Sequence, residues 1–278
     1  MKSSTFKRFA KRKASVAGGV IIAFFVLVAI VGPYLTVYDP LAIDLPGKYQ
    51  HASWEHPLGT DNLGRDTLTR LVYGARTTFV ISFIAVFSGS LVGLLLGVVA
   101  GYFGGRIDDA LMRTTDVLLA FPGLLLAIAI VAILGNGIGN TIIAIAIYNI
   151  PYIARIVRGS VLSIRNSEYV QAAKVIGASH SRIILTHIIP NSFSQVIVNT
   201  TLSLGTAILT SSSLSFLGLG VQPPHPEWGS MLSKAREVIR SVPIAALAPG
   251  IAITMVVLSF SLLGDGLRDA LDPRLKNS

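Results

Sequence analysis

The sequence contains no cysteine and little charge. Without cysteine the chain has no disulfide, no thiol nucleophile and no Cys-based metal site. Charged residues make up 13% of the 278 residues, whereas a typical soluble domain carries about 25%. Hydrophobic residues make up 52%, and several apolar runs approach the roughly 20 residues that a helix needs to cross a bilayer. The sequence therefore predicts an all-α polytopic membrane protein.

The motifs of soluble catalysis are also missing. The Gly47-Lys48 pair is followed by Tyr49, so it does not form a Walker A phosphate-binding loop. His180 and His187 are seven residues apart, but no third ligand accompanies them, and we predict no metal site. We interpret the chain as a non-catalytic subunit that binds no cofactor of its own.

The apolar runs lack a series of Asp, Glu, Lys or Arg residues. Ion-coupled transporters usually need such groups near the middle of the membrane. A transport protein with neither an acidic relay nor a nucleotide site must take its energy from another chain. This absence therefore favours a subunit that is driven by a partner.

The formal net charge of +9 is concentrated between the apolar runs, which argues against nucleic acid as a partner. The first 14 residues carry a basic cluster without any acid: Lys2, Lys7, Arg8, Lys11, Arg12 and Lys13. The positive-inside rule places such a cluster in the cytoplasm. The run 14–37 that follows is too long for the apolar h-region of a signal peptide and ends without a cleavage site, so it is the first expected transmembrane helix.

Residues 38–77 are polar and rich in turn formers, and we expect them to lie outside the membrane. We accordingly divide the chain into 1–77 (cytoplasmic tail, first helix and outer loop) and 78–278 (the main transmembrane domain). The second apolar run, 79–102, carries a repeated GxxxG pattern whose members are Gly89, Gly93, Gly97 and Gly101. Such a row lets another helix approach closely. The alternative explanation for this row is that glycine is simply common in membrane helices.

Two shorter apolar runs follow a charged stretch at 103–116 that we expect to be a loop. The third run, 117–134, and the fourth, 141–156, are joined by a glycine-rich turn and resemble a helical hairpin. Four crossings return the chain to the cytoplasm before residue 160. The next segment is basic, which agrees with that count under the positive-inside rule.

The cytoplasmic segment Glu168–Pro190 reads as a helix–turn–helix between the fourth and fifth transmembrane helices. Gly177 interrupts it, Ser179 is placed to cap the second short helix, and Pro190 is expected to end that helix. A short helical turn at a membrane surface is a shape that a partner can push. We predict that force enters the protein here.

The fifth run, 196–217, is rich in hydroxyl groups. Polar side chains in a membrane helix usually face the protein interior or an aqueous path. The residues that we predict as path-lining are Asn199, Ser203, Thr206 and Thr210. The alternative is that these groups bond to their own helix and pack against neighbours.

An outer loop containing Trp228 leads to the sixth expected helix, 244–263, and to a cytoplasmic tail. Tryptophan commonly sits at a membrane interface, so an interfacial anchor is the simplest interpretation of Trp228. The expected fold has six transmembrane helices, and both termini lie in the cytoplasm.

The segment Glu168–Pro190 resembles the EAA loop of ABC-transporter permeases. That loop has the pattern Glu-Ala-Ala, three residues, Gly, nine residues, Ile-x-Leu-Pro. Here Gln171-Ala172-Ala173, Gly177 and Pro190 keep the spacing. Gln171 replaces the glutamate and His187 replaces the isoleucine, while Glu168 one turn earlier offers an acid. These departures leave the shape of the loop intact.

Further motifs resemble the second permease subunit of the dipeptide, oligopeptide and nickel uptake group. They are LGTDNLGRD (58–66), Phe121-Pro122, SFLGLG (215–220), Trp228-Gly229 and LDPRL (271–275). The likeness extends from about residue 15 to the C-terminus.

The resemblance implies a subunit in a bacterial inner membrane, surrounded by lipid. Its implied partners are a homologous second permease, two ATP-binding subunits that carry ATP and Mg²⁺, and an extracytoplasmic solute-binding protein. The ATPases would dock on the EAA loop, where the small Ala172, Ala173 and Gly177 allow close approach. A short peptide is the expected cargo, with glutathione or nickel as alternatives. An ATP-independent channel or secondary transporter and a scaffold subunit remain the alternatives of other classes.

Overall fold

The computed structural model describes residues 9–10 and 12–271 of the chain. Within these ranges the regular secondary structure is helical apart from one isolated β-bridge between Thr60 and Asp66, and turns and irregular segments connect the helices. The long helices are α2 (Lys13–Leu35), α3 (Thr67–Phe103), α6 (Ile138–Arg165), α9 (Ile189–Phe216) and α11 (Ile244–Leu271). The shorter elements are η1 (Leu45–Gly47), α4 (Gly105–Leu119), α5 (Gly123–Leu134), α7 (Glu168–Val175), α8 (His180–Ile183), η2 (Ile184–Ile188), α10 (Trp228–Ala235) and η3 (Arg236–Val238).

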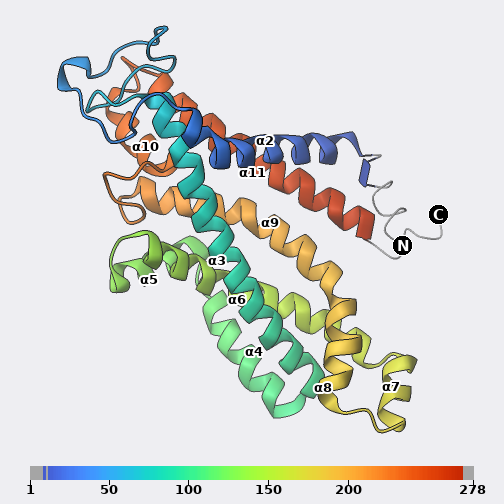
Figure 1. The fold of residues 1–278 in the computed structure, drawn as a ribbon. Coiled ribbons are helices and arrows are strands. Elements are labelled where there is room, and N and C mark those ends of the chain that lie inside the picture. Colours follow the sequence, from blue (N-terminus) through green and yellow to red (C-terminus); the bar gives the residue numbers. More distant parts are fainter. Residues whose placement is uncertain (1–8, 11, 272–278) are drawn as a thin grey trace.

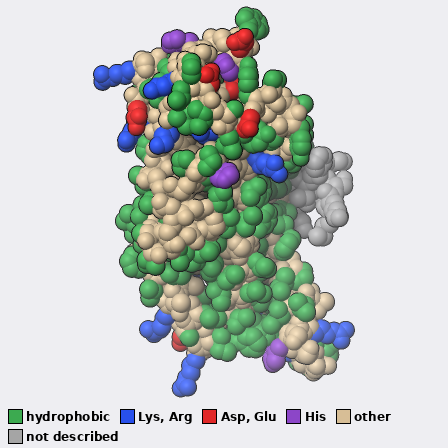
Figure 2. Space-filling view, turned by 60° about the vertical axis from the view of Figure 1, so that its left-hand side comes forward, with side chains coloured by type: hydrophobic (Ala, Val, Ile, Leu, Met, Phe, Trp, Pro, Cys, Tyr) green, Lys and Arg blue, Asp and Glu red, His purple; other side chains and the backbone are tan. Residues whose placement is uncertain are grey.

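Five helical stretches are long and apolar enough to cross a membrane. They belong to α2, α3, α6, α11 and the continuous helix His180–Phe216, and the bent pair α4–α5 makes a sixth if it counts as one span. Figure 1 shows the stretch 36–66 and α10 at one end of the bundle and α7–α8 at the other. Figure 2 shows a largely apolar belt between two ends where charged side chains gather. The six-helix membrane fold predicted from the sequence is confirmed at this level.

The stretch 103–116, expected as a loop, is mostly helical. Helix α4 occupies Gly105–Leu119, and its apolar and charged residues segregate to different faces. Its charges are compensated across the α4–α6 contact. Asp108 binds Arg158 through two oxygens at 2.5 and 2.6 Å, and Asp116 binds Arg155 at 2.6 Å. The loop expectation was wrong because charge alone does not prevent an amphipathic helix from forming when its polar face finds partners.

The third apolar run is also not one straight span. Helices α4 and α5 meet at 90° across the break at Ala120–Pro122. Pro122 disfavours a helical conformation at Phe121 and cannot donate a backbone hydrogen bond, so the helix stops and restarts. Helix α5 alone has 12 residues and reaches only about 18 Å, which is too short to cross a bilayer.

Two helices extend beyond the expected limits. Helix α3 begins at Thr67, inside the stretch 38–77 expected as an outer loop, because the Asp66 carboxylate caps it by accepting the Thr69 N–H at 2.7 Å. The boundary that we drew after residue 77 therefore falls within α3. Helix α6 continues to Arg165, beyond residue 156 where we expected the fourth apolar run to end.

The GxxxG glycines of α3 face helix α6. A Cβ atom built on Gly89 would lie 2.7 Å from the Ala146 carbonyl oxygen, and one on Gly97 would lie 2.5 Å from the Ala154 carbonyl oxygen. The same construction places Gly93 and Gly101 2.8 Å from their neighbours on α6. These distances leave no room for a side chain, so the two backbones touch along four successive turns.

Trp228 is fully buried at the start of α10. Its ring packs against Phe25 of α2 and Phe79 of α3, and its indole N–H donates to the Leu71 carbonyl at 2.9 Å. The interpretation of Trp228 as an interfacial anchor is therefore wrong. Burial of the large apolar surface of Trp228 instead stabilises the packing of α10, and of the segment that leads to it, against the bundle.

The basic residues Lys2, Lys7, Arg8 and Lys11, and most of the LDPRL motif, lie outside the described residues. The interpretations placed on them stay sequence predictions.

Candidate coupling loop and substrate path

Helix α7 is tied back to the end of α6. The Gln171 side-chain amide donates to the Arg165 carbonyl at 2.9 Å, and the Ser167 hydroxyl donates to the Ile164 carbonyl at 2.6 Å. Gln171 thus holds a backbone group near the C-terminus of α6. Glu168 lies exposed in the first turn of α7, where a negative charge is favourable beside the helix N-terminus.

The two faces of α7 differ in what they contact. Val170 and Ala173 are buried and belong to an apolar cluster that also includes Val157 and Ile183. Ala172 is exposed on the other face. The expectation that Ala173 offers a small surface to a partner was therefore wrong, since Ala173 packs inside its own chain. Ala172 and Gly177 remain accessible.

The turn between α7 and α8 is a Schellman turn. Gly177 has φ +81°, the Gly177 N–H donates to the Lys174 carbonyl, and the Ala178 N–H donates to the Ala173 carbonyl, both at 3.0 Å. A left-handed conformation of this kind favours glycine. The predicted break at Gly177 is confirmed. The predicted cap at Ser179 is also confirmed, because its hydroxyl accepts the Arg182 N–H at 3.4 Å.

Pro190 does not end the second short helix. The helix runs without interruption from His180 to Phe216, and Pro190 lies in the first turn of α9. A π-helical turn, η2, directly precedes it and contains Thr186, whose carbonyl would meet the proline ring in a regular helix. The wider turn therefore accommodates the proline, and the loop is joined rigidly to the membrane helix α9.

Sequence reasoning missed an apolar edge on this loop. Val175 is 87% exposed, Ile176 83% and Leu185 67%. The first two directly precede the Gly177 turn, and Leu185 lies in η2 on the second arm of the loop. Residues of this kind beside a helix-ending glycine are a recognisable pattern, but exposure could not be read from the sequence. The apolar edge adds area that a partner could bury.

The two histidines have separate contacts. The His180 Nδ1 lies 2.9 Å from the Tyr102 hydroxyl, which links α8 to the end of α3. The His187 ring lies against Tyr169 at 5.8 Å between centroids. Over the described part of the chain, no group of three or more His, Asp or Glu side chains is placed to hold a metal ion.

A hollow of about 200 Å³ lies between α6 and α9. Two of the residues predicted to line a path, Ser203 and Thr206, line it, while Asn199 and Thr210 do not. Asn199 instead donates to the Gln195 carbonyl of its own helix at 2.8 Å. Tyr148 and Tyr152 of α6 complete the hollow and were missed, because they lie in an apolar run without a polar pattern.

A buried polar group joins three helices beside this hollow. The Ser90 hydroxyl of α3 lies 3.1 Å from both the Asn149 amide of α6 and the Thr200 hydroxyl of α9. Interhelical bonds of this kind hold apolar helices in register, since lipid offers them no alternative partner. The hollow therefore has one fixed polar wall.

The comparisons with known proteins agree with each other. The profile of the family described as "binding-protein-dependent transport system inner membrane component" matches residues 93–277, and that of the "N-terminal TM domain of oligopeptide transport permease C" matches residues 3–52. The dipeptide transport system permease protein DppC of Alkalihalophilus pseudofirmus is 49% identical over 272 residues, which cover 98% of this chain and 90% of that protein. The glutathione transport system permease protein GsiD of Escherichia coli is 45% identical with the same coverage.

Solved structures show the same fold. The inward-facing MetNI methionine ABC transporter matches with a TM-score of 0.61 and 18% identity, covering 73% of this chain and 97% of that one. An amino acid ABC transporter matches with a TM-score of 0.52 and 21% identity, covering 71% and 92%. Together with the helical membrane bundle, these findings show that the chain belongs to the binding-protein-dependent inner membrane components and is an integral permease subunit of an ABC importer of the peptide/nickel uptake group.

Proposed function

We propose that this subunit forms one half of a path for short peptides and transmits force to it from separate ATPase subunits. A homologous second permease supplies the other half. A solute-binding protein delivers cargo at the outer end, and ATP and Mg²⁺ are bound on the two ATPases rather than on this chain.

One observation carries the coupling role. The Gly177 turn and the exposed apolar edge of α7–α8 lie at the end of the molecule opposite α10 (Figure 1). The second arm of this loop continues without a break into α9, which lines the hollow. A displacement of the loop by a docked ATPase therefore reaches α9 directly, because a continuous helix transmits movement along its axis.

The proposed orientation follows from this role. Helices α7 and α8 lie in the cytoplasm, and so do the start of α2 and the end of α11. The stretch 38–66 and α10 lie on the extracytoplasmic side, where cargo arrives. The basic residues of the loop region support this assignment under the positive-inside rule.

The cargo is proposed from the relatives. The matched relatives transport a dipeptide or glutathione by name, and both cargoes are small peptides. Nickel is the weaker candidate, because the described residues place no cluster of metal ligands along the bundle.

The coupling proposal is tested with Gly177→Leu. Leucine at φ +81° is strained by about 1–2 kcal/mol, and its side chain would stand in the surface that we assign to the ATPase. We expect the variant to insert into membranes normally and to lose ATPase co-purification. Gly159→Leu is the matched control, since a side chain there meets nothing within 4 Å. Wild-type ATPase recovery with Gly177→Leu would contradict the proposal.

The composition of the importer is tested by purifying the tagged chain from detergent-solubilised membranes and identifying bound proteins by mass spectrometry. We expect a second permease, ATP-binding subunits and a solute-binding protein. The reconstituted complex should then import a labelled dipeptide in the presence of ATP. Import of nickel but of neither a dipeptide nor glutathione would overturn the cargo assignment.

A further inference from the structure

A cavity of about 160 Å³ lies beside α10, at the opposite end of the molecule from α7–α8. Its walls come from the stretch 49–65, the start of α3, the end of α9 with the residues that follow it, α10, η3 and the start of α11. A volume of this size is comparable to a cavity that holds one benzene-sized molecule. The cavity therefore has room for one small group.

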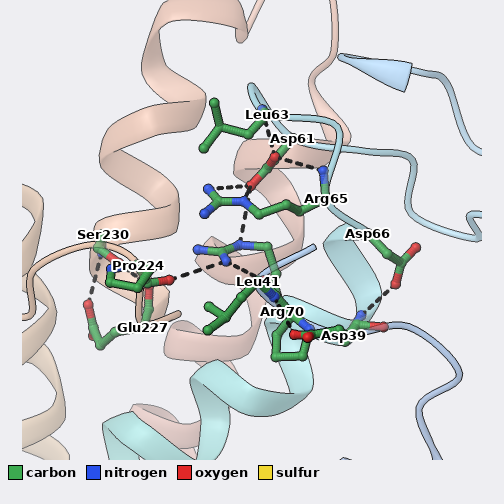
Figure 3. Close-up of polar contacts among 12 residues, drawn as sticks. Asp39, Leu41, Asp61, Leu63, Arg65, Asp66, Arg70, Pro224, Glu227 and Ser230 are labelled. Carbon is green, nitrogen blue, oxygen red and sulfur yellow. Dashed lines mark hydrogen bonds and ion pairs between the residues drawn. The ribbon is translucent and has the colours of Figure 1, made fainter. Parts of the chain in front are cut away.

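The charges around the cavity do not balance. Asp61 accepts from Arg65 Nε at 2.8 Å and lies 3.2 Å from Arg70 Nε, so one carboxylate serves two guanidinium groups (Figure 3). The Arg65 and Arg70 side chains are only 8% and 7% exposed. Burying an unbalanced positive charge is costly unless an anion accompanies it.

Two further basic side chains line the same cavity. Lys234 of α10 and His225 make no ion pair among the residues that the structure describes. The negative charge of Glu237 acts on the Tyr49 hydroxyl, but Glu237 is exposed and lies outside the lining. The Glu227 carboxylate is likewise outside the lining and is occupied by the Ser230 N–H at 2.9 Å. The cavity lining thus keeps an excess of positive charge.

Arg70 also fixes the shape of the cavity. Its Nη1 donates to the Pro40 carbonyl at 2.7 Å and lies 3.5 Å from the Pro224 carbonyl (Figure 3). One guanidinium group therefore joins the outer stretch, α3 and the segment before α10. This preorganisation lowers the cost of ordering the site when a ligand binds.

Two buried polar atoms of the lining have no hydrogen-bond partner. The Thr67 hydroxyl belongs to a residue that is 2% exposed, and the Asn62 side-chain oxygen is also inaccessible. An unpaired buried polar group costs about 1–3 kcal/mol. The hydroxyl of Thr67 can donate to an anion, whereas the Asn62 oxygen can only accept from an N–H or O–H group.

We propose that this cavity binds a carboxylate with an adjacent amide N–H, which is the group at the C-terminus of a peptide. The basic side chains and Thr67 would hold the carboxylate, and Asn62 would accept the amide N–H. The proposal deepens the proposed function, since peptide cargo carries this group, but the site lies apart from the hollow between α6 and α9. It is a contact for cargo at the proposed outer side.

The test measures binding to the purified permease–ATPase complex in nanodiscs without ATP, so that a failure of transport does not affect the result. The probe is N-acetylglycine, followed by saturation-transfer NMR. Acetate lacks the amide, and N-acetylglycinamide lacks the negative charge. We expect N-acetylglycine to bind at least tenfold more tightly than either. Equal binding of acetate would assign the site to any carboxylate, including an acidic side chain of a docked protein, and would overturn the peptide assignment.

Two variants locate the binding in this cavity. Lys234→Met removes an exposed charge, and Thr67→Val removes a hydroxyl that has no partner in the protein, so both should fold. We expect about tenfold weaker binding in the first, which corresponds to one charged contact, and a several-fold loss in the second. Arg240→Met is the control, because Arg240 lies outside the lining. Unchanged binding in both variants, or no binding of N-acetylglycine to the wild type, would overturn the proposal.

Discussion

The glycines of α3 show how single residues decide the packing of this bundle. Each has a backbone neighbour on α6 where a side chain would stand. Two helices that touch at backbone distance gain dispersion contacts that lipid cannot replace. The absence of a Cβ atom at each of these positions is therefore a packing feature.

We predict that Gly97→Leu destabilises the protein more than any change at an open glycine. A Cβ at this position already lies 2.5 Å from a backbone oxygen, and overpacking of this kind costs about 1–3 kcal/mol or more. The measurement is the thermal unfolding of the detergent-solubilised chain. Gly139→Leu is the control, because its Cβ would meet nothing within 4 Å. An equal unfolding temperature for the two variants would show that α3 and α6 do not pack this closely.

Glu227 is the most buried acid that the structure describes. Burial raises the pKa of its carboxyl above the usual 4.5, although hydrogen bonds from Gly229 and Ser230 oppose the shift. The native state then holds the proton more tightly than the unfolded state. The contribution of Glu227 to the free energy of unfolding is therefore fully present below pH 4.5, and it is lost as the pH rises through the native pKa.

We predict that Glu227→Gln removes this pH dependence. Glutamine keeps the acceptor for the Ser230 N–H and carries no charge. The unfolding temperature of the variant should therefore change less between pH 4.5 and 8 than that of the wild type. Thermal unfolding across that range provides the measurement. An identical pH slope in both proteins would show that Glu227 does not titrate on folding.

At the scale of elements, the charged stretch after α3 forms the helix α4 rather than a loop. It lies along α6 through two ion pairs of different exposure. The Asp108–Arg158 pair has side chains 11% and 34% exposed, while those of the Asp116–Arg155 pair are more than half exposed. The two pairs join the same helices, so they form a matched comparison.

We predict that Asp108→Asn costs more stability than Asp116→Asn. Breaking the better-buried, two-point pair leaves Arg158 partly uncompensated, at a cost of about 1–3 kcal/mol. An exposed pair contributes about 0–1 kcal/mol. Chemical denaturation of both variants, with a double-mutant cycle at each pair, measures the difference. A larger loss from Asp116→Asn would reverse the assigned order.

Helices α7 and α8 carry an exposed apolar edge on one side and buried residues on the other. The residues of their exposed apolar edge do not belong to the buried cluster, so a surface change need not disturb the core. We predict that Ile176→Ser weakens ATPase co-purification several-fold while the chain remains folded. The control is Val37→Ser. Val37 is similarly exposed and lies two residues after the end of α2, so the change should not affect ATPase co-purification. Equal losses from the two variants would contradict the assignment.

On the scale of the whole molecule, the two ends of the bundle differ in character. One end carries the stretch 36–66, α10 and the basic cavity, and the other carries the α7–α8 loop (Figure 1). An importer needs such asymmetry, because cargo and energy arrive from opposite sides. The arrangement makes the orientation of the chain a direct test of the proposed function.

We predict opposite labelling of two engineered thiols. The chain has no cysteine of its own, so Trp54→Cys and Ile176→Cys, both at strongly exposed positions, each provide a single thiol. A membrane-impermeant maleimide should label position 54 in intact spheroplasts and position 176 only after the membrane is opened. Labelling of both positions in intact spheroplasts would contradict the proposed orientation.

The sequence by itself determined the membrane class, the close-packing glycines and the turn at Gly177. Each depends on local composition or spacing, and a bilayer admits few alternatives to a helix. Phe121-Pro122 and Asp66 were also visible in the sequence. Where the neighbouring helices begin and end, however, depends on which groups satisfy the backbone N–H and C=O groups left unpaired at the helix ends. Charged residues misled us at α4 because their partners lie on a distant helix.

Only the tertiary structure decided which side of α7 is buried, that Trp228 belongs to the core and that Pro190 continues its helix. It also brought together Thr67, Asn62 and Lys234 from separate segments. These features depend on contacts between residues far apart in the chain, and local pattern carries no information about such contacts. The physical reason is that burial is a property of packed surfaces, whereas helix formation and turns are properties of neighbouring residues.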